Sequence, residues 1–157
     1  NKYSMNLNKN NKHLVLVNPM NMGNFGTIIR SALGFGFTDI AVIKPAIDIF
    51  DPKVIRSAMG SFFSCNIKYF NTIEEYIKQY PDHKLYSFML QAKKTLQNTK
   101  FNNNELFSLV FGNESSGLPI SYLNDDSIII SHSNKIDSLN LPMAVTIALY
   151  EVNKQIK

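Results

Sequence analysis

The stretch Leu106-Phe107-Ser108-Leu109-Val110-Phe111 runs directly into Gly112-Asn113-Glu114-Ser115-Ser116-Gly117-Leu118-Pro119. The first part is almost entirely apolar, which predicts a strand buried on both faces. In the second part, Gly112 is expected to let a ligand lie over the strand end, and Gly117 marks a second tight bend. Glu114, between them, either caps a helix start or binds a hydroxyl or amine. Loops after parallel strands form ligand-binding edges of α/β sheets, so residues 112–119, the binding loop, are predicted to line a site.

A second segment, residues 24–30 (NFGTIIR), follows the loop after another apolar run at residues 13–18. Gly23 and Gly26 are expected to let the backbone turn and approach a ligand, ahead of a helix over residues 26–35. The free N–H groups at that helix start favour an anion. The glycine spacing matches neither the dinucleotide nor the phosphate-loop pattern, which disfavours NAD and ATP. Arg30 either points to solvent or holds a phosphate or hydroxyl with its planar guanidinium.

A third segment, Ser138-Leu139-Asn140-Leu141, precedes the last predicted helix, over residues 141–154. Ser138 or Asn140 can cap that helix, and Pro142 suits its first turn. The helix is apolar nearly all round, so it must be buried on two sides. It is therefore either a central core helix or the interface of a homodimer.

Strands and helices alternate along the chain. The sequence predicts strands at 13–18, 40–43, 66–70, 85–90, 106–111 and 127–131, and helices at 26–35, 52–59, 72–80 and 141–154, with a short helix within 116–124. Because the strands are apolar on both faces, this alternation predicts an α/β fold with a mostly parallel sheet flanked by helices.

Size and composition limit the function classes. A chain of 157 residues with 45% hydrophobic residues predicts one globular domain, here residues 13–157. Residues 1–12 are rich in Asn and Lys and are interpreted as a tail or interdomain linker, trimmed or belonging to something longer because the chain begins at Asn1. The single Cys65 excludes internal disulfides and suits the cytoplasm, and no apolar run reaches the ~20 residues that span a membrane.

The Cys and His side chains give little further indication of function. There is no metal-binding cluster of Cys and His, and Cys65 has no visible activating partner. His132 follows the last predicted strand and could line a site, although a lone His is more often structural. The net charge of +4 permits contact with nucleic acid without establishing it.

Taken together and in this order, the three segments resemble the signature motifs of the SpoU/TrmH branch of the SPOUT RNA methyltransferases, over about residues 13–155. Residues 54–61 (VIRSAMGS) also resemble members that act on ribosomal RNA. The resemblance implies an S-adenosylmethionine-dependent 2′-O-ribose methyltransferase and a homodimer through the carboxyl-terminal helix. It further implies a carboxyl-terminal trefoil knot, which general topology rules would have argued against.

The resemblance also implies residue roles. Arg30 would be the principal catalytic residue, and Asn24 would position it or support its loop. The catalytic set would be completed by Glu114, Ser138 and Asn140. The cofactor would lie in the knot cleft, held largely by backbone groups around Phe88, Met89, Gly112, Ile130 and Leu139.

Two stretches beside the expected cofactor cleft depart from the family pattern. Ile130-Ser131-His132 stands where Ile-Pro-Met is usual, and Leu141-Pro142-Met143 stands where small residues are usual. Three alternatives stay open: a transfer RNA substrate in place of ribosomal RNA, a non-catalytic RNA-binding module, and methylation of a base.

Overall fold

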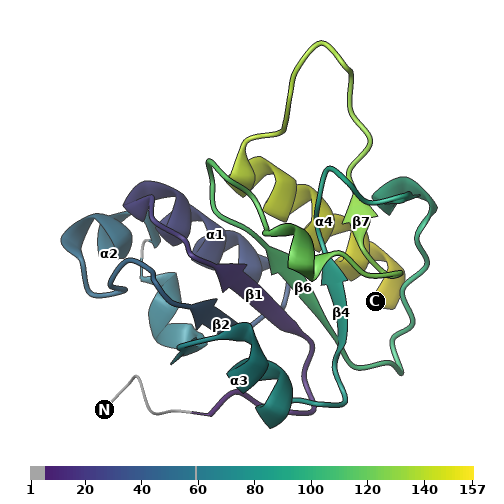
Figure 1. The fold of residues 1–157 in the computed structure, drawn as a ribbon. Helices are drawn as coiled ribbons and strands as arrows, with labels where there is room; N and C mark the ends of the chain where they lie inside the picture. Colours follow the sequence, from purple (N-terminus) through teal and green to yellow (C-terminus); the bar gives the residue numbers. More distant parts are fainter. Residues whose placement is uncertain (1–5, 59) are drawn as a thin grey trace.

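The computed structural model describes residues 6–58 and 60–157, and its centre is a sheet of five parallel strands (Figure 1). The strand order is β3-β2-β1-β6-β4. The bounds are β1 (His13–Val17), β2 (Asp39–Ile43), β3 (Asn66–Phe70), β4 (Lys84–Ser87) and β6 (Phe107–Phe111). This arrangement confirms the predicted α/β fold with a mostly parallel sheet.

Helices cover both faces of the sheet, as the apolar strands require. In β1, Leu14 and Leu16 pack on one side with α1 (Met22–Gly34), α2 (Pro52–Ala58) and α4 (Leu141–Ile156). Val15 and Val17 pack on the other side with α3 (Ile73–Gln79) and Leu118 of the binding loop. β1 is buried at every position because it is a central strand with both faces covered.

Helix α1 begins four residues earlier than the sequence predicts. Asn21 is its N-cap, and the Asn21 side chain accepts a hydrogen bond from the Asn24 N–H at 2.9 Å. Gly23 and Gly26 therefore lie inside the helix, and their prediction as turn residues beside a ligand is wrong. A Cβ on Gly26 would lie 1.9 Å from Ser57 Oγ and 2.6 Å from the Val54 carbonyl oxygen, so Gly26 allows α1 and α2 to pack closely.

The carboxyl-terminal half differs most from prediction. β4 ends at Ser87, and the chain continues with Phe88 N–H donating to Val110 O and Met89 N–H donating to Ile128 O. The last predicted strand shortens to β7 (Ile128–Ile129), which pairs with the unforeseen β5 (Lys94–Thr95) in a separate two-stranded sheet. Short 3-10 turns η2 (Ser61–Ser64), η3 (Leu96–Asn98) and η4 (Ile120–Tyr122) complete the elements. The trefoil knot stays a prediction.

Residues 6–12 lie against the amino ends of the strands. Leu7 is buried and its N–H donates to the Tyr80 hydroxyl at 3.0 Å. The Asn8 N–H donates to Asp39, and the Asn8 carbonyl oxygen accepts from His13. The assignment of residues 1–12 as a tail or linker stays a prediction.

Helix α4 buries one side only. Val145, Ala148, Leu149 and Val152 are fully buried. Met143, Ile147 and Tyr150, spaced by four and three residues, are 59%, 39% and 56% exposed. One chain therefore leaves an apolar stripe of α4 exposed, here called the α4 stripe.

Candidate active site

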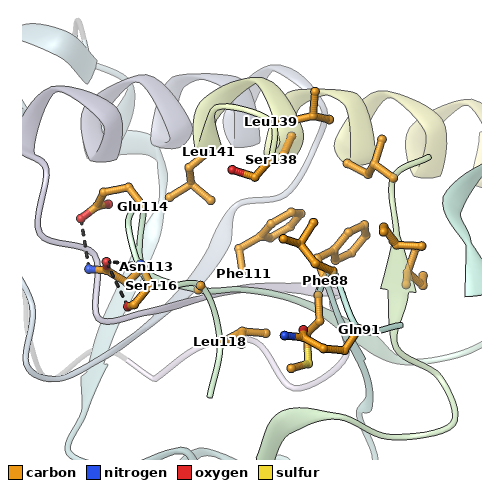
Figure 2. A pocket seen from close by; sticks show the side chains of 18 of the residues that line it. Phe88, Gln91, Phe111, Asn113, Glu114, Ser116, Leu118, Ser138, Leu139 and Leu141 are labelled. Carbon is orange, nitrogen blue, oxygen red and sulfur yellow. Dashed lines mark hydrogen bonds between the residues drawn. The ribbon is translucent and has the colours of Figure 1, made fainter. Parts of the chain in front are cut away.

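A pocket opens at the carboxyl ends of β4 and β6, at the edge of the sheet where the sequence predicts a site (Figure 2). Its volume is about 200 Å³. Seven of the ten predicted site residues line it: Phe88, Met89, Gly112, Glu114, Ile130, Ser138 and Leu139. The second and third segments, far apart in the sequence, therefore form one cavity, whereas Asn24, Arg30 and Asn140 lie outside its lining.

Aromatic rings form the apolar part of the pocket. The rings of Phe88 and Phe111 are stacked with centroids 4.3 Å apart and planes 13° from parallel, as Figure 2 shows. Phe88 follows β4 and Phe111 ends β6, and these two strands are hydrogen-bonded neighbours. Such an apolar surface suits the flat face of a nucleobase.

Glu114 joins the binding loop to the start of α1. Its Oε1 accepts hydrogen bonds from the backbone N–H groups of Met20 (2.7 Å) and Asn21 (3.0 Å). The anion expected before α1 is thus the protein's own carboxylate, and Glu114 caps that segment rather than a helix of its own loop. Oε2 of Glu114 is buried without a hydrogen-bond partner among the described residues. A buried carboxylate oxygen of this kind is costly unless a ligand donor reaches it.

Asn113, which the sequence reasoning passed over, organises the binding loop. Its Oδ1 accepts from the N–H groups of Ser115 and Ser116, and its Nδ2 donates to Asn18 O at 2.8 Å. One side chain therefore closes the turn and ties it to the end of β1. An Asn directly after a strand-ending glycine is a signal for such a turn.

The backbone of the binding loop requires glycine at positions 112 and 117, for a different reason at each. A Cβ on Gly112 would lie 2.3 Å from the Gly117 carbonyl carbon and 2.4 Å from Leu118 N. The loop folds back on itself there, so close backbone packing leaves no room for a side chain. Gly117 has a φ of +67°, which confirms the second tight bend.

Arg30 and Asn24 both lie on α1 and outside the lining of the pocket. Asn24 is in the first turn, and the exposed Arg30 lies further along the same helix. Next to Arg30, Ser31 Oγ accepts a hydrogen bond from Thr146 of α4 at 3.1 Å. Since α4 follows the third segment directly, α1 is fixed to both other segments, through Glu114 and through Thr146.

No side chain of the third segment caps the start of α4. Asn140 occupies the N-cap position of α4, yet its side chain makes no capping hydrogen bond, and Pro142 lies in the first turn as predicted. Ser138 is exposed and borders the pocket. The side chain of Ser138 is therefore available to a ligand.

The chemistry of the lining fits S-adenosylmethionine. Glu114 is its one carboxylate, and the lining contains no Lys or Arg. A net negative, partly aromatic pocket suits a ligand with an aromatic base and a cationic sulfonium. Phe88, Phe111, Glu114 and Ser138 are the side chains that would contact it.

Other chemistry finds no support in the described residues. Among residues 6–58 and 60–157, no group of three His, Cys, Asp or Glu side chains could hold a metal ion. Burial, with the Asp39 charge as a smaller cause, raises the pKa of the Cys65 thiol to about 11, so it is a poor nucleophile. None of the described helices is long and apolar enough to cross a membrane.

Comparison with known proteins places this geometry in a family. The chain spans about half the length of the curated relatives it matches first. One of them, the 23S rRNA (guanosine(2553)-2′-O)-methyltransferase of Bacillus subtilis, is 29% identical over 83% of this chain and 53% of its own.

Two solved structures align over nearly the whole chain. The SpoU methyltransferase AviRb of Streptomyces viridochromogenes, in complex with the cofactor AdoMet, is 26% identical with a TM-score of 0.82, over 98% of this chain and 60% of its own. A structure concerned with 2-OH methylation of C/U34 on tRNA is 25% identical with a TM-score of 0.85, over 95% and 98%. The model of the SpoU rRNA methylase family matches residues 11–150, and the chain belongs to this family.

Proposed function

We propose that this chain is the catalytic domain of an S-adenosylmethionine-dependent RNA 2′-O-ribose methyltransferase. The observation that carries the proposal is the pocket that the second and third segments build together, which Glu114 ties to the helix that bears Arg30. Family membership and the AdoMet complex of AviRb support it.

Each segment has a part in the proposed reaction. When bound, S-adenosylmethionine supplies an electrophilic methyl group. Arg30 holds the phosphate beside the target ribose and stabilises the developing 2′-alkoxide. Arginine is not deprotonated in proteins, so the proton leaves to a phosphate oxygen or to water and not to Arg30. Asn24 supports Arg30 from the same helix, while Ser138 and Asn140 complete the substrate side.

Ribosomal RNA is the favoured substrate. The B. subtilis relative acts on 23S rRNA, and residues 54–58 of the stretch that resembles ribosomal RNA members lie in α2, which packs against α1. The tRNA-related structure is nearly matched in length, which keeps transfer RNA as the second candidate. Parallel assays on transcripts of both kinds distinguish the two.

Several further properties belong to the proposal. The α4 stripe is the homodimer interface, because an exposed apolar row of this kind favours association. The carboxyl-terminal part is threaded as a trefoil knot, and the protein works in the cytoplasm. A non-catalytic RNA-binding module is disfavoured because the chain keeps the whole expected catalytic set: Asn24, Arg30, Glu114, Ser138 and Asn140.

Calorimetric titration with S-adenosylhomocysteine, the demethylated cofactor, tests the cofactor site. We expect binding in the micromolar range and about tenfold weaker binding for Phe88→Ala, which removes one of the stacked rings. Ile77→Ala, on the exposed face of α3, serves as the control and is expected to bind normally. No binding up to millimolar concentration contradicts the enzyme function.

A further inference from the structure

Glu114 is the one carboxylate among the described residues that line the pocket, and no Lys or Arg belongs to that lining. Its Oε1 accepts hydrogen bonds from the N–H groups of Met20 (2.7 Å) and Asn21 (3.0 Å) and from Nδ2 of Asn113 (3.3 Å). All three donors are neutral amides, and no described side chain forms an ion pair with Glu114. The pocket therefore carries a negative charge that no cation of the described chain cancels.

The second oxygen of Glu114 leaves this charge unneutralised. Oε2 is buried and has no hydrogen-bond partner within the part of the chain that the structure describes. Beside a partly aromatic wall that includes Phe88 and Phe111, a charge is screened less than in bulk water. Because the pocket has a volume of only about 200 Å³, a positive charge held in it lies near this carboxylate whichever wall its ligand touches.

The proposed reaction changes the charge of the bound ligand by one unit. The S–C bond breaks with its electron pair left on sulfur, an O–C bond forms to the ribose 2′-oxygen, and the hydroxyl proton leaves to a phosphate oxygen or to water. The ligand before transfer is a sulfonium cation at sulfur, and the ligand after transfer is a neutral thioether. Both have the same nucleoside and the same amino-acid tail, so the two differ by one methyl group and one charge.

We infer that the charge of Glu114 makes the pocket distinguish S-adenosylmethionine from its demethylated product, an inference that rests on the proposed function. Attraction to the carboxylate strengthens binding of the sulfonium and is lost once sulfur is neutral. An amide at position 114 could accept the same backbone hydrogen bonds but would bring no charge. Glu114 thus has two parts in the site: Oε1 holds the start of α1, and the negative charge sets the preference between cofactor and product.

Three ligands separate charge from shape. S-adenosylmethionine has a positive sulfur, S-adenosylhomocysteine lacks that charge, and sinefungin has a protonated amine in place of the methylsulfonium group. Calorimetry at pH 7.5, where histidine side chains are ordinarily mostly neutral, compares the unaltered protein with Glu114→Gln, which keeps the size of the side chain and one acceptor oxygen. Glu74→Gln, which removes an exposed carboxylate of α3 outside the pocket lining, is the control.

We expect Glu114→Gln to weaken S-adenosylmethionine and sinefungin about tenfold, and S-adenosylhomocysteine less than about twofold. The retained binding of S-adenosylhomocysteine also shows that the pocket of the variant is folded. In Glu74→Gln, the affinities for all three ligands should change less than about twofold, because that carboxylate is exposed and screened by solvent.

Three results would overturn the inference. Equal weakening of all three ligands shows that Glu114 acts through the shape of the binding loop and not through its charge. Unchanged binding of all three shows that the charge does not reach the ligand. Weakening of sinefungin alone shows a hydrogen bond from its amine and no preference for the sulfonium. If none of the three binds the unaltered protein, the proposed function itself fails.

Discussion

The carboxylate of Glu114 accepts a hydrogen bond from the backbone N–H of Met20 at 2.7 Å, across 94 residues of sequence. The same oxygen accepts from Asn21, the N-cap of α1. These hydrogen bonds fix the binding loop, which lines the pocket, against the start of the helix that carries Arg30. Through this contact, the position of the proposed catalytic Arg30 depends on the binding loop.

Removing Glu114 is expected to loosen this junction. In Glu114→Ala, the N–H groups of Met20 and Asn21 lose their acceptor, and the free energy of unfolding should fall by ~1–3 kcal/mol. Glu114→Gln keeps one acceptor oxygen and should lose less than ~1 kcal/mol. Urea denaturation measures both variants, and equal losses would show that the hydrogen bonds do not carry the effect.

Gly26 and Gly34, both in α1, should respond oppositely to substitution by alanine. In Gly26→Ala, the new Cβ meets Ser57 Oγ and the backbone of α2, so we expect ~1–3 kcal/mol of destabilisation. Gly34 has no atom within 4 Å of its Cβ position, and Gly34→Ala should stabilise by up to ~1 kcal/mol through helix propensity. Thermal unfolding compares them, and a destabilised Gly34→Ala would contradict the reasoning.

Stability should fall below neutral pH because of His13. Burial is the main cause that lowers the pKa of His13 to about 4, against an ordinary value near 6.5, while the nearby His83 lowers it further and the Asn8 carbonyl opposes the shift. Between pH 6.5 and 4, the unfolded chain binds a proton on His13 that the folded protein does not. The free energy of unfolding should therefore drop by ~3 kcal/mol over that range as the pH falls.

The variant His13→Gln isolates this contribution. Its stability at neutral pH should be lower, because the hydrogen bonds of His13 with Tyr76 (2.8 Å) and with Asn8 (2.8 Å) are altered. Its loss of stability from pH 6.5 to 4 should be smaller than that of the unaltered protein by ~3 kcal/mol. Parallel curves for the two proteins would exclude His13 as the source.

The proposed homodimer depends on the α4 stripe. Tyr150→Arg places a charge on an exposed apolar position, so it should convert a dimer to a monomer without unfolding the chain. Ile77→Arg, at a comparably exposed position on α3, should leave the dimer intact. Sedimentation velocity measures both variants, and an unchanged sedimentation coefficient for Tyr150→Arg would place the interface elsewhere.

The sequence predicts the central sheet well because β1, β2 and β6 are mostly apolar and are buried at every position. It misses the small second sheet at the carboxyl end, since the pairing of β5 with β7 covers only two residues in each strand and leaves no periodic pattern. The start of α1 was missed because Asn21 caps it before two glycines that disfavour a helix.

The candidate site, too, could be predicted only in part from the sequence. The pocket residues could be predicted because Gly112 and Glu114 follow a predicted strand and Ser138 precedes a predicted helix, in segments that resemble known motifs. The role of Glu114 could not, because its partners Met20 and Asn21 are backbone groups that carry no sequence signal. The reason for Gly26 depends on contact with Ser57 of another helix, which appears only once the chain is folded.

Mass spectrometry of nucleosides from treated RNA tests the central claim most directly. Ribosomal and transfer RNA transcripts are incubated with S-adenosylmethionine and either the unaltered protein or Arg30→Ala, then digested completely. The account predicts a 2′-O-methylated nucleoside with the unaltered protein and a rate lower by ~10²–10³-fold with Arg30→Ala, which loses the donor to the developing alkoxide. A methylated base, or an Arg30→Ala variant with undiminished activity, would contradict it.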